Sequence, residues 1–150
     1  MEIVLARPHA LLRNSVTAAL QRCGLAPRIV NSAAEILQLQ RSVVSGAIVS
    51  AAASSDVGAS LPEMLERFRE AQPNLPLVIT TLMDADQVMA ASLDKVIKDA
   101  YGACDLISMD AELQAAPCRQ RPWHILVLTR RDLEVERDVD AVLQKHFSRS

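Results

Sequence analysis

Residues 75–81 read Leu-Pro-Leu-Val-Ile-Thr-Thr, a short apolar run that ends in two threonines. The run follows Gln72-Pro73-Asn74, which ends a stretch of helical spacing. A short strand that is apolar throughout is typical of a parallel sheet covered by helices on both faces. We therefore expect Leu77–Ile79 to be a buried strand of such a sheet.

The same pattern recurs on both sides of this stretch. Leu12, Val16 and Leu20 repeat at helical spacing, and Gly24 predicts the end of that helix. Alternating strands and helices indicate a three-layer α/β/α fold with a doubly wound parallel sheet, of the flavodoxin-like type. The expected strands are Ile3–Ala6, Arg28–Val30, Ala47–Val49, Leu77–Ile79, Cys104–Met109 and His124–Thr129.

The last third of the chain leaves the number of strands open between five and six. The stretch Cys104–Pro122 is either part of the sheet or an irregular insertion before the true fifth strand. We favour six strands. Trp123–Ser150 then supplies the final strand and a single helix with an apolar face that includes Val135 and Val139. We expect residues 1–150 to form one domain.

Composition and charge exclude several classes of protein. The 150 residues carry 16 Lys and Arg against 18 Asp and Glu, so the chain has no basic footprint for direct nucleic-acid binding. No apolar run approaches the roughly 20 residues of a membrane span, and a cytoplasmic location is expected. The three cysteines, Cys23, Cys104 and Cys118, lie far apart, which argues against a zinc site or a disulfide framework.

Functional residues of an open parallel sheet gather at the carboxyl ends of its strands. Those ends are Arg7–His9, Ser50–Ser54 and Thr80–Met83. No glycine-rich phosphate loop follows the first strand, and no GxSxG elbow surrounds the serines. We therefore expect a protein that is not an enzyme.

Several pieces of the sequence, in their order and spacing, resemble the receiver domain of two-component response regulators. They are Ile3-Val4-Leu5, Leu12-Arg13, Gly24, Leu75–Thr81 and Gly102–Ile107, and the resemblance covers most of residues 1–110. It implies two acidic residues that bind magnesium after the first strand and an aspartate at the end of the third strand that accepts a phosphoryl group. A threonine or serine and a lysine complete such a site.

Carried over to this chain, the resemblance gives positions that mostly lack this chemistry. The acidic pair falls on Ala6 and Arg7 (or Arg7 and Pro8), the phosphoacceptor on Ser50 or Ala51, the hydroxyl on Thr81 and the lysine on Met109. Only Thr81 matches.

These departures argue against phosphotransfer. Magnesium prefers carboxylate oxygens, which Ala6 lacks, and Arg7 would repel the ion. Without a metal or a lysine, the charge on a transferring phosphoryl group has little to stabilise it. We expect no metal and no cofactor, and a phosphorylation-independent pseudo-receiver that serves as a regulatory protein-interaction module in bacterial signal transduction or transcription control.

Arg7 leaves a second hypothesis open. Its guanidinium either forms an internal ion pair with Asp56 or Asp84, which would lock the domain in one state, or binds an anion together with Ser50 and Thr81. The second arrangement would make the chain a sensor of an anionic small molecule or a minor enzyme.

The resemblance also implies a working surface. In receivers this surface comprises the helix after the fourth strand, the fifth strand and the final helix. Leu106 falls on it, and Trp123 with Arg119 and Arg121 has the composition of an interface anchor. The expected partners are a second copy of the chain, which would form a homodimer, a histidine kinase or an output domain.

Overall fold

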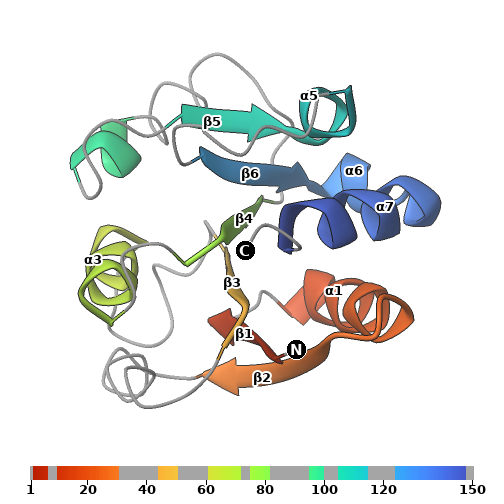
Figure 1. The fold of residues 1–150 in the computed structure, drawn as a ribbon, viewed down its shortest axis with the longest axis horizontal. Helices are drawn as coiled ribbons and strands as arrows, with labels where there is room; N and C mark the ends of the chain where they lie inside the picture. Colours follow the sequence, from red (N-terminus) through yellow and green to blue (C-terminus); the bar gives the residue numbers. More distant parts are fainter. Residues whose placement is uncertain are drawn as a thin grey trace.

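A computed structural model describes residues 2–6, 10–30, 44–50, 61–71, 75–81, 95–99, 105–114 and 124–147. The described part alternates strands and helices as the sequence predicts (Figure 1). In chain order the elements are β1 (Glu2–Ala6), α1 (Ala10–Arg22), β2 (Ala26–Val30), β3 (Gly46–Ser50), α3 (Leu61–Ala71), β4 (Leu77–Thr81), β5 (Asp105–Ser108), α5 (Met109–Gln114), β6 (His124–Thr129), α6 (Arg130–Leu133) and α7 (Glu136–Phe147). Residues 95–99 are also helical.

The described strands form one six-stranded sheet in the order β2-β1-β3-β4-β6-β5. All neighbouring strands are parallel. Every residue of β3 and β4 is buried, which explains why the sequence of each is apolar nearly throughout. The prediction of a doubly wound parallel sheet with six strands is confirmed.

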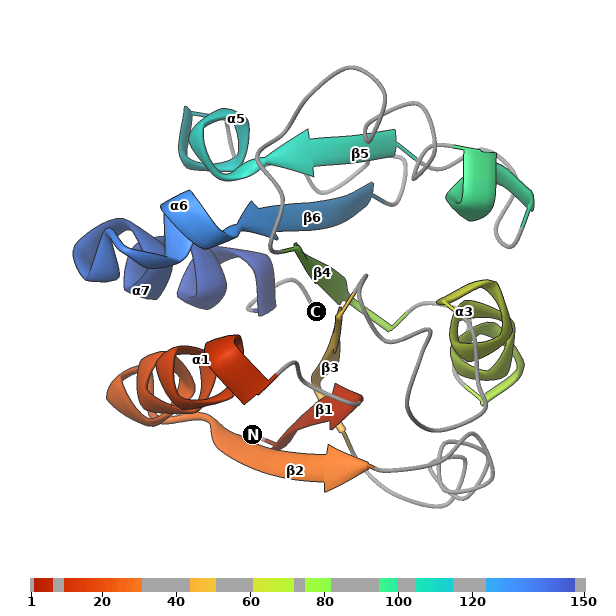
Figure 2. The same cartoon turned by 180° about the vertical axis from the view of Figure 1, so that it is seen from behind.

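Helices cover both faces of the sheet (Figures 1 and 2). The helices α1, α5, α6 and α7 lie on one face, and α3 and the short helix at 95–99 lie on the other. Alternate residues of a strand point to opposite faces, so Val4 and Ala6 join the core under α3 while Ile3 and Leu5 join the core under α1 and α7. None of the helices in the described ranges is long and apolar enough to cross a membrane.

The last strand in the sequence does not take the edge of the sheet. β6 lies between β4 and β5, so β5 is the edge strand (Figure 1). In the flavodoxin-like order 2-1-3-4-5 the fifth strand neighbours the fourth. Here β6 occupies that place, and β5 with α5 adds one β-α unit beyond it. The stretch Cys104–Pro122 thus contains a strand of the sheet, inserted in the chain between β4 and β6.

The predicted final helix is present, but the prediction that Val135 belongs to it is wrong. α6 ends at Leu133, and α7 begins at Glu136. Between them, the carbonyl oxygen of Val135 accepts hydrogen bonds from the backbone N–H groups of Asp138 and Val139, which opens the new helix. The Val135 side chain is 46% exposed and does not belong to the buried face of α7.

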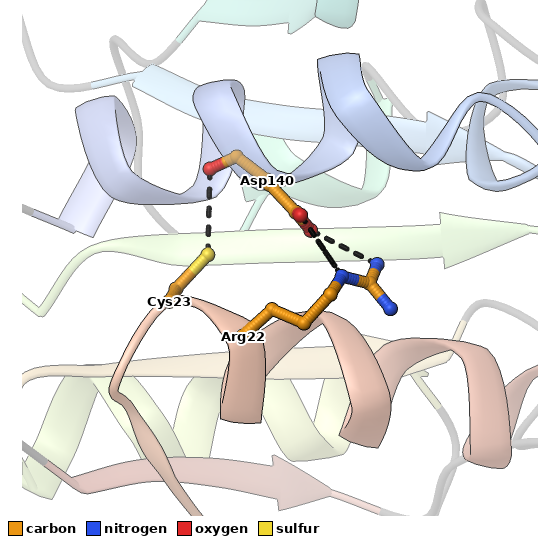
Figure 3. A network of polar contacts seen from close by, with 3 residues as sticks. All are labelled: Arg22, Cys23 and Asp140. Atoms are coloured by element: carbon orange, nitrogen blue, oxygen red, sulfur yellow. Dashed lines mark hydrogen bonds and ion pairs between the residues drawn. The ribbon is translucent and has the colours of Figure 1, made fainter.

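Polar contacts fix α7 against α1 (Figure 3). Nε and Nη2 of Arg22, at the end of α1, donate hydrogen bonds of 2.9–3.1 Å to the carboxylate of Asp140. The hydrogen bond to Asp140 raises the pKa of the Arg22 guanidinium. The adjacent thiol of Cys23 donates to the carbonyl oxygen of Asp140 at 3.4 Å, and burial raises the pKa of that thiol. The last residue of α1 and the residue that follows it therefore both bond to Asp140 of α7.

Candidate functional site

The carboxyl ends of the four inner strands meet at one edge of the sheet. The register pairs Ala6 of β1 with Val49 of β3, and Ser50 with Thr80 of β4. Thr81, the last residue of β4, pairs with Thr129, the last residue of β6. This edge is where an open parallel sheet places its functional crevice.

The side chains at these strand ends are a methyl group and three hydroxyls. Ala6 is fully buried, and Ser50, Thr81 and Thr129 are no more than 8% exposed. None of the four carries a carboxylate. Among the described residues, no group of three His, Cys, Asp or Glu side chains lies close enough together to hold a metal ion.

Ser50 and Thr81 do not face each other. Val49 belongs to the core under α3 and Ile48 to the core under α1 and α7, so alternation directs Ser50 to the α1 side. Ile79 belongs to the core under α3, and alternation directs Thr81 to that side, the side of Ala6. The two predicted site hydroxyls therefore lie on opposite faces of the sheet.

Met109, predicted to stand at the lysine position, follows the outer strand β5 and is separated from β4 by β6. It begins α5, after the edge strand, and its buried side chain packs in the core under α1 and α7. Because β6 and not β5 neighbours β4, the residue beside Thr81 is Thr129. Thr129, and not Met109, is therefore the strand-end residue beside Thr81.

Thr129 serves to cap α6. Its Oγ1 accepts a hydrogen bond of 3.1 Å from the backbone N–H of Asp132, and the Asp132 carboxylate accepts one of 3.0 Å from the backbone N–H of Thr129. This reciprocal pair is a capping box. The sequence did not predict that Thr129 lies at this site. The spacing Thr129-x-x-Asp132 is nevertheless the sequence signal of such a cap.

The remaining predicted residues divide into two groups. Leu106 of β5 is partly buried and packs against the core under α3, so much of its side chain is used within the fold. Seven predicted residues lie outside the described residues, and the ion pair, anion site and interface expected from most of them stay predictions. They are Arg7, Ala51, Asp56, Asp84, Arg119, Arg121 and Trp123.

Comparison with solved structures shows what the chain is similar to. The receiver domain of a sensor histidine kinase from Pseudomonas aeruginosa PAO1, which has a magnesium ion coordinated in its active-site cleft, superposes with a TM-score of 0.59 and 11% identity, over 98% of this chain and 97% of that one. A response regulator receiver protein from Sinorhizobium medicae gives 0.54 and 16%, over 95% and 94%. A putative pilus assembly-related protein from Burkholderia pseudomallei gives 0.58 and 16%, over 99% and 90%.

The chain therefore has the fold of response-regulator receiver domains over nearly its whole length. Comparison of the sequence with protein-family models and with curated proteins gives no match. The chain has this fold, but its described inner strands end without the acidic residues that the resemblance implies.

Proposed function

We propose that this chain is a degenerate receiver domain that acts without phosphotransfer, as a regulatory protein-interaction module in bacterial two-component signalling or transcription control. One observation carries the proposal: the inner strands end in Ala6, Ser50, Thr81 and Thr129, which are buried and bear no charge. A receiver fold whose described inner strands end in a methyl group and hydroxyls keeps the frame of the site without the carboxylates and the lysine of its chemistry.

The chemistry of phosphoryl transfer explains why these residues matter. Magnesium needs carboxylate ligands to hold it beside the phosphate, and Ala6 supplies none at the end of β1. A cation must also balance the charge on the transferring group. Thr129, at the end of the strand beside Thr81, is neutral and already occupied by the α6 cap.

A domain without this chemistry regulates through contact. The partners that fit the proposal are a second copy of the chain, which would make a homodimer, a histidine kinase or an output domain, all in the cytoplasm. The surface that we propose for such contact is the added β5–α5 unit, because β5 is one of the two edge strands of the described sheet. An edge strand presents a row of backbone groups that another chain is able to pair with.

Intact-mass spectrometry after incubation with magnesium and acetyl phosphate tests the absence of phosphotransfer. A receiver domain with its acidic residues, treated in parallel, verifies that the reagent is active. We expect the mass of this chain to stay unchanged while that of the control increases by one phosphoryl group. Stoichiometric addition of a phosphoryl group to any residue at the carboxyl edge would refute the proposal.

A thermal-shift screen separates this function from the alternative of an anion sensor built on Arg7, Ser50 and Thr81. A ligand present at 100 times its dissociation constant stabilises the folded state by about 2.7 kcal/mol. Because Ser50 and Thr81 lie on opposite faces of the sheet, we expect no shift with millimolar phosphate or nucleotides. A dose-dependent shift that Arg7→Ala abolishes would favour the sensor.

A further inference from the structure

A buried pair of ionisable side chains joins α5 to α7. His146 of α7 is 1% exposed and Glu112 of α5 is fully buried. The ring Nδ1 of His146 lies 3.3 Å from Oε1 of Glu112, and its Nε2 lies 2.8 Å from the carbonyl oxygen of Leu77, at the start of β4. The contact lies within one side of the molecule but links three elements: α5, α7 and β4.

The two distances fix how many protons the contact needs. A carbonyl oxygen only accepts, so Nε2 of His146 carries a proton and donates it to Leu77. The other nitrogen faces a carboxyl group, and one further proton must lie between Nδ1 and Oε1. This proton resides either on an imidazolium beside a carboxylate or on a neutral carboxylic acid beside a neutral ring. Without it, two buried acceptors would face each other.

The other charged groups near this contact form hydrogen bonds or ion pairs with other atoms, or are exposed. Nζ of Lys145, the preceding residue of α7, donates to the carbonyl oxygens of Glu112 at 2.6 Å and Leu113 at 3.4 Å. From α5, Asp110 is exposed, and from β4 the group that faces the ring is the Leu77 carbonyl. On the α1 side, Arg22 and Asp140 of α7 bond each other. The ring edge of Phe147 completes the surroundings, with centroids 5.5 Å apart.

We propose that His146 and Glu112 form a proton-dependent latch that holds the β5–α5 unit on the rest of the domain. Besides this contact, the unit is held by the pairing of β5 with β6, by the core packing of Met109 and by the hydrogen bonds of Lys145. β5 has four residues and pairs with one strand, and α5 has six residues, too few for a helix to be stable without its packing. Breaking a buried pair of ionisable groups is strongly destabilising, so this contact adds a proton-dependent part to the attachment of the unit. This inference does not rest on the proposed function.

The direction of the pH effect follows from the proton count. When the unit is released into water at alkaline pH, solvent satisfies the carboxylate and the neutral ring separately, whereas the latched pair must keep one proton between them. At alkaline pH the latched state therefore binds one proton more than the released state. The equilibrium between latched and released unit then shifts toward release by up to about tenfold for each pH unit.

Hydrogen exchange measured by mass spectrometry at several pH values tests the latch. Protection factors, which remove the intrinsic pH dependence of exchange, are compared between the amides of 105–114 and those of β3 and β4 in the same molecule. We expect the protection of 105–114 to fall by up to about tenfold per pH unit above neutrality, while β3 and β4 keep theirs.

Two matched substitutions in α5 sharpen the test. In Glu112→Gln the amide NH2 donates to Nδ1 of a neutral His146, so the contact no longer needs the titrating proton and the pH dependence should vanish. Asp110→Asn removes the same charge from an exposed position of the same helix and should retain the pH dependence. A flat profile in the unsubstituted protein, or an unchanged slope in Glu112→Gln, overturns the proposal.

A spectroscopic measurement keeps the proposal testable if Glu112→Gln does not fold. In the unsubstituted protein, the ring ¹⁵N signals of His146 and the carboxyl ¹³C signal of Glu112 report the shared proton. We expect one of these groups to titrate over the pH range in which residues 105–114 lose protection. Loss of protection without titration of either group would contradict the latch.

Discussion

Thr81 and Thr129 are register partners at the carboxyl ends of β4 and β6. Thr81 matches the hydroxyl position of a receiver site, and the partner beside it is a threonine that caps the next helix. The strand that neighbours β4 thus ends in a structural residue at the place where phosphoryl transfer would need a cation. Under the proposed function, this pairing means that the site lacks its lysine as well as its acidic residues.

The capping role of Thr129 predicts a stability effect. Thr129→Ala removes the oxygen that accepts from the Asp132 N–H and should lower the free energy of unfolding by about 1 kcal/mol. Thr129→Ser keeps an oxygen at that position and should retain most of the stability. Urea denaturation of the three proteins measures the difference. Equal loss in both variants would show that the methyl group, and not the cap, is what matters.

The close approach of Gly46 to Phe147 predicts a second effect. A Cβ atom at Gly46 would overlap Cδ1 and Cε1 of the Phe147 ring, which ends α7 against the start of β3. We expect Gly46→Ala to destabilise the domain by about 1–3 kcal/mol through overpacking. Adding Phe147→Leu should recover part of that loss in a double-mutant cycle measured by denaturation.

Gly24 provides the matched control for this cycle. It has a positive φ of 73°, but a Cβ there would meet no atom within 4 Å. Gly24→Ala should therefore destabilise through backbone strain alone, by about 1–2 kcal/mol. Because no ring is involved, Phe147→Leu should leave that loss unchanged. An interaction energy between Gly24→Ala and Phe147→Leu as large as that between Gly46→Ala and Phe147→Leu would refute the steric explanation.

The surroundings of Cys23 predict how the alkylation of its thiol depends on pH. Burial raises the pKa of the thiol, and Asp140 raises it further, whereas Arg22 lowers it. The thiolate should thus form at higher pH in the folded protein than the ordinary value of about 8.5. The midpoint of the pH profile for alkylation, followed at the Cys23 peptide, should be higher in buffer than in urea.

Asp140→Asn tests the cause of that shift. The substitution removes the carboxylate that raises the pKa of Cys23 and leaves the guanidinium of Arg22 in place, so the midpoint should move down. An identical midpoint in folded and urea-unfolded protein would contradict the burial of the thiol.

The interface anchor that the sequence predicts at Trp123, Arg119 and Arg121 implies a concentration-dependent assembly. Analytical ultracentrifugation should show a dimer at micromolar concentration, and the combined substitution of Trp123, Arg119 and Arg121 by alanine should shift it to the monomer. Arg67 and Glu70 form an exposed ion pair on α3, on the face of the sheet opposite α5, and their substitution by alanine is the control that should leave the dimer intact. If the Arg67 and Glu70 variant loses the dimer instead, the interface lies on α3.

The sequence predicted the layered fold because strands such as Leu77–Thr81 are apolar throughout and the helices have apolar faces at regular spacing. It did not predict where β6 lies. Strand order depends on contacts between distant residues, and both Asp105–Ser108 and His124–Thr129 have the composition of a strand. The break before α7 was also missed, since Val135 fits the helical spacing of Val139 and Val142 although its side chain is exposed.

The candidate site was predictable in part. The loss of a carboxylate at Ala6 and the presence of Thr81 follow from the sequence once the strands are located. The identity of the residue beside Thr81 depended on the strand order, and this is why Met109 was assigned to the lysine position. The buried pair of His146 and Glu112 joins residues 34 apart in the chain, and no local pattern in the sequence signals it.

The most direct test of the central claim is an NMR titration of the ¹⁵N-labelled chain with magnesium and then with beryllofluoride, a mimic of the phosphoryl group. The amide signals of Ala6, Ser50, Thr81 and Thr129 report the ends of the four inner strands. If the site has lost its metal and phosphoryl chemistry, these signals stay in place at millimolar magnesium and after the beryllofluoride addition. Saturable shifts at these four residues would contradict the claim and show a working receiver site.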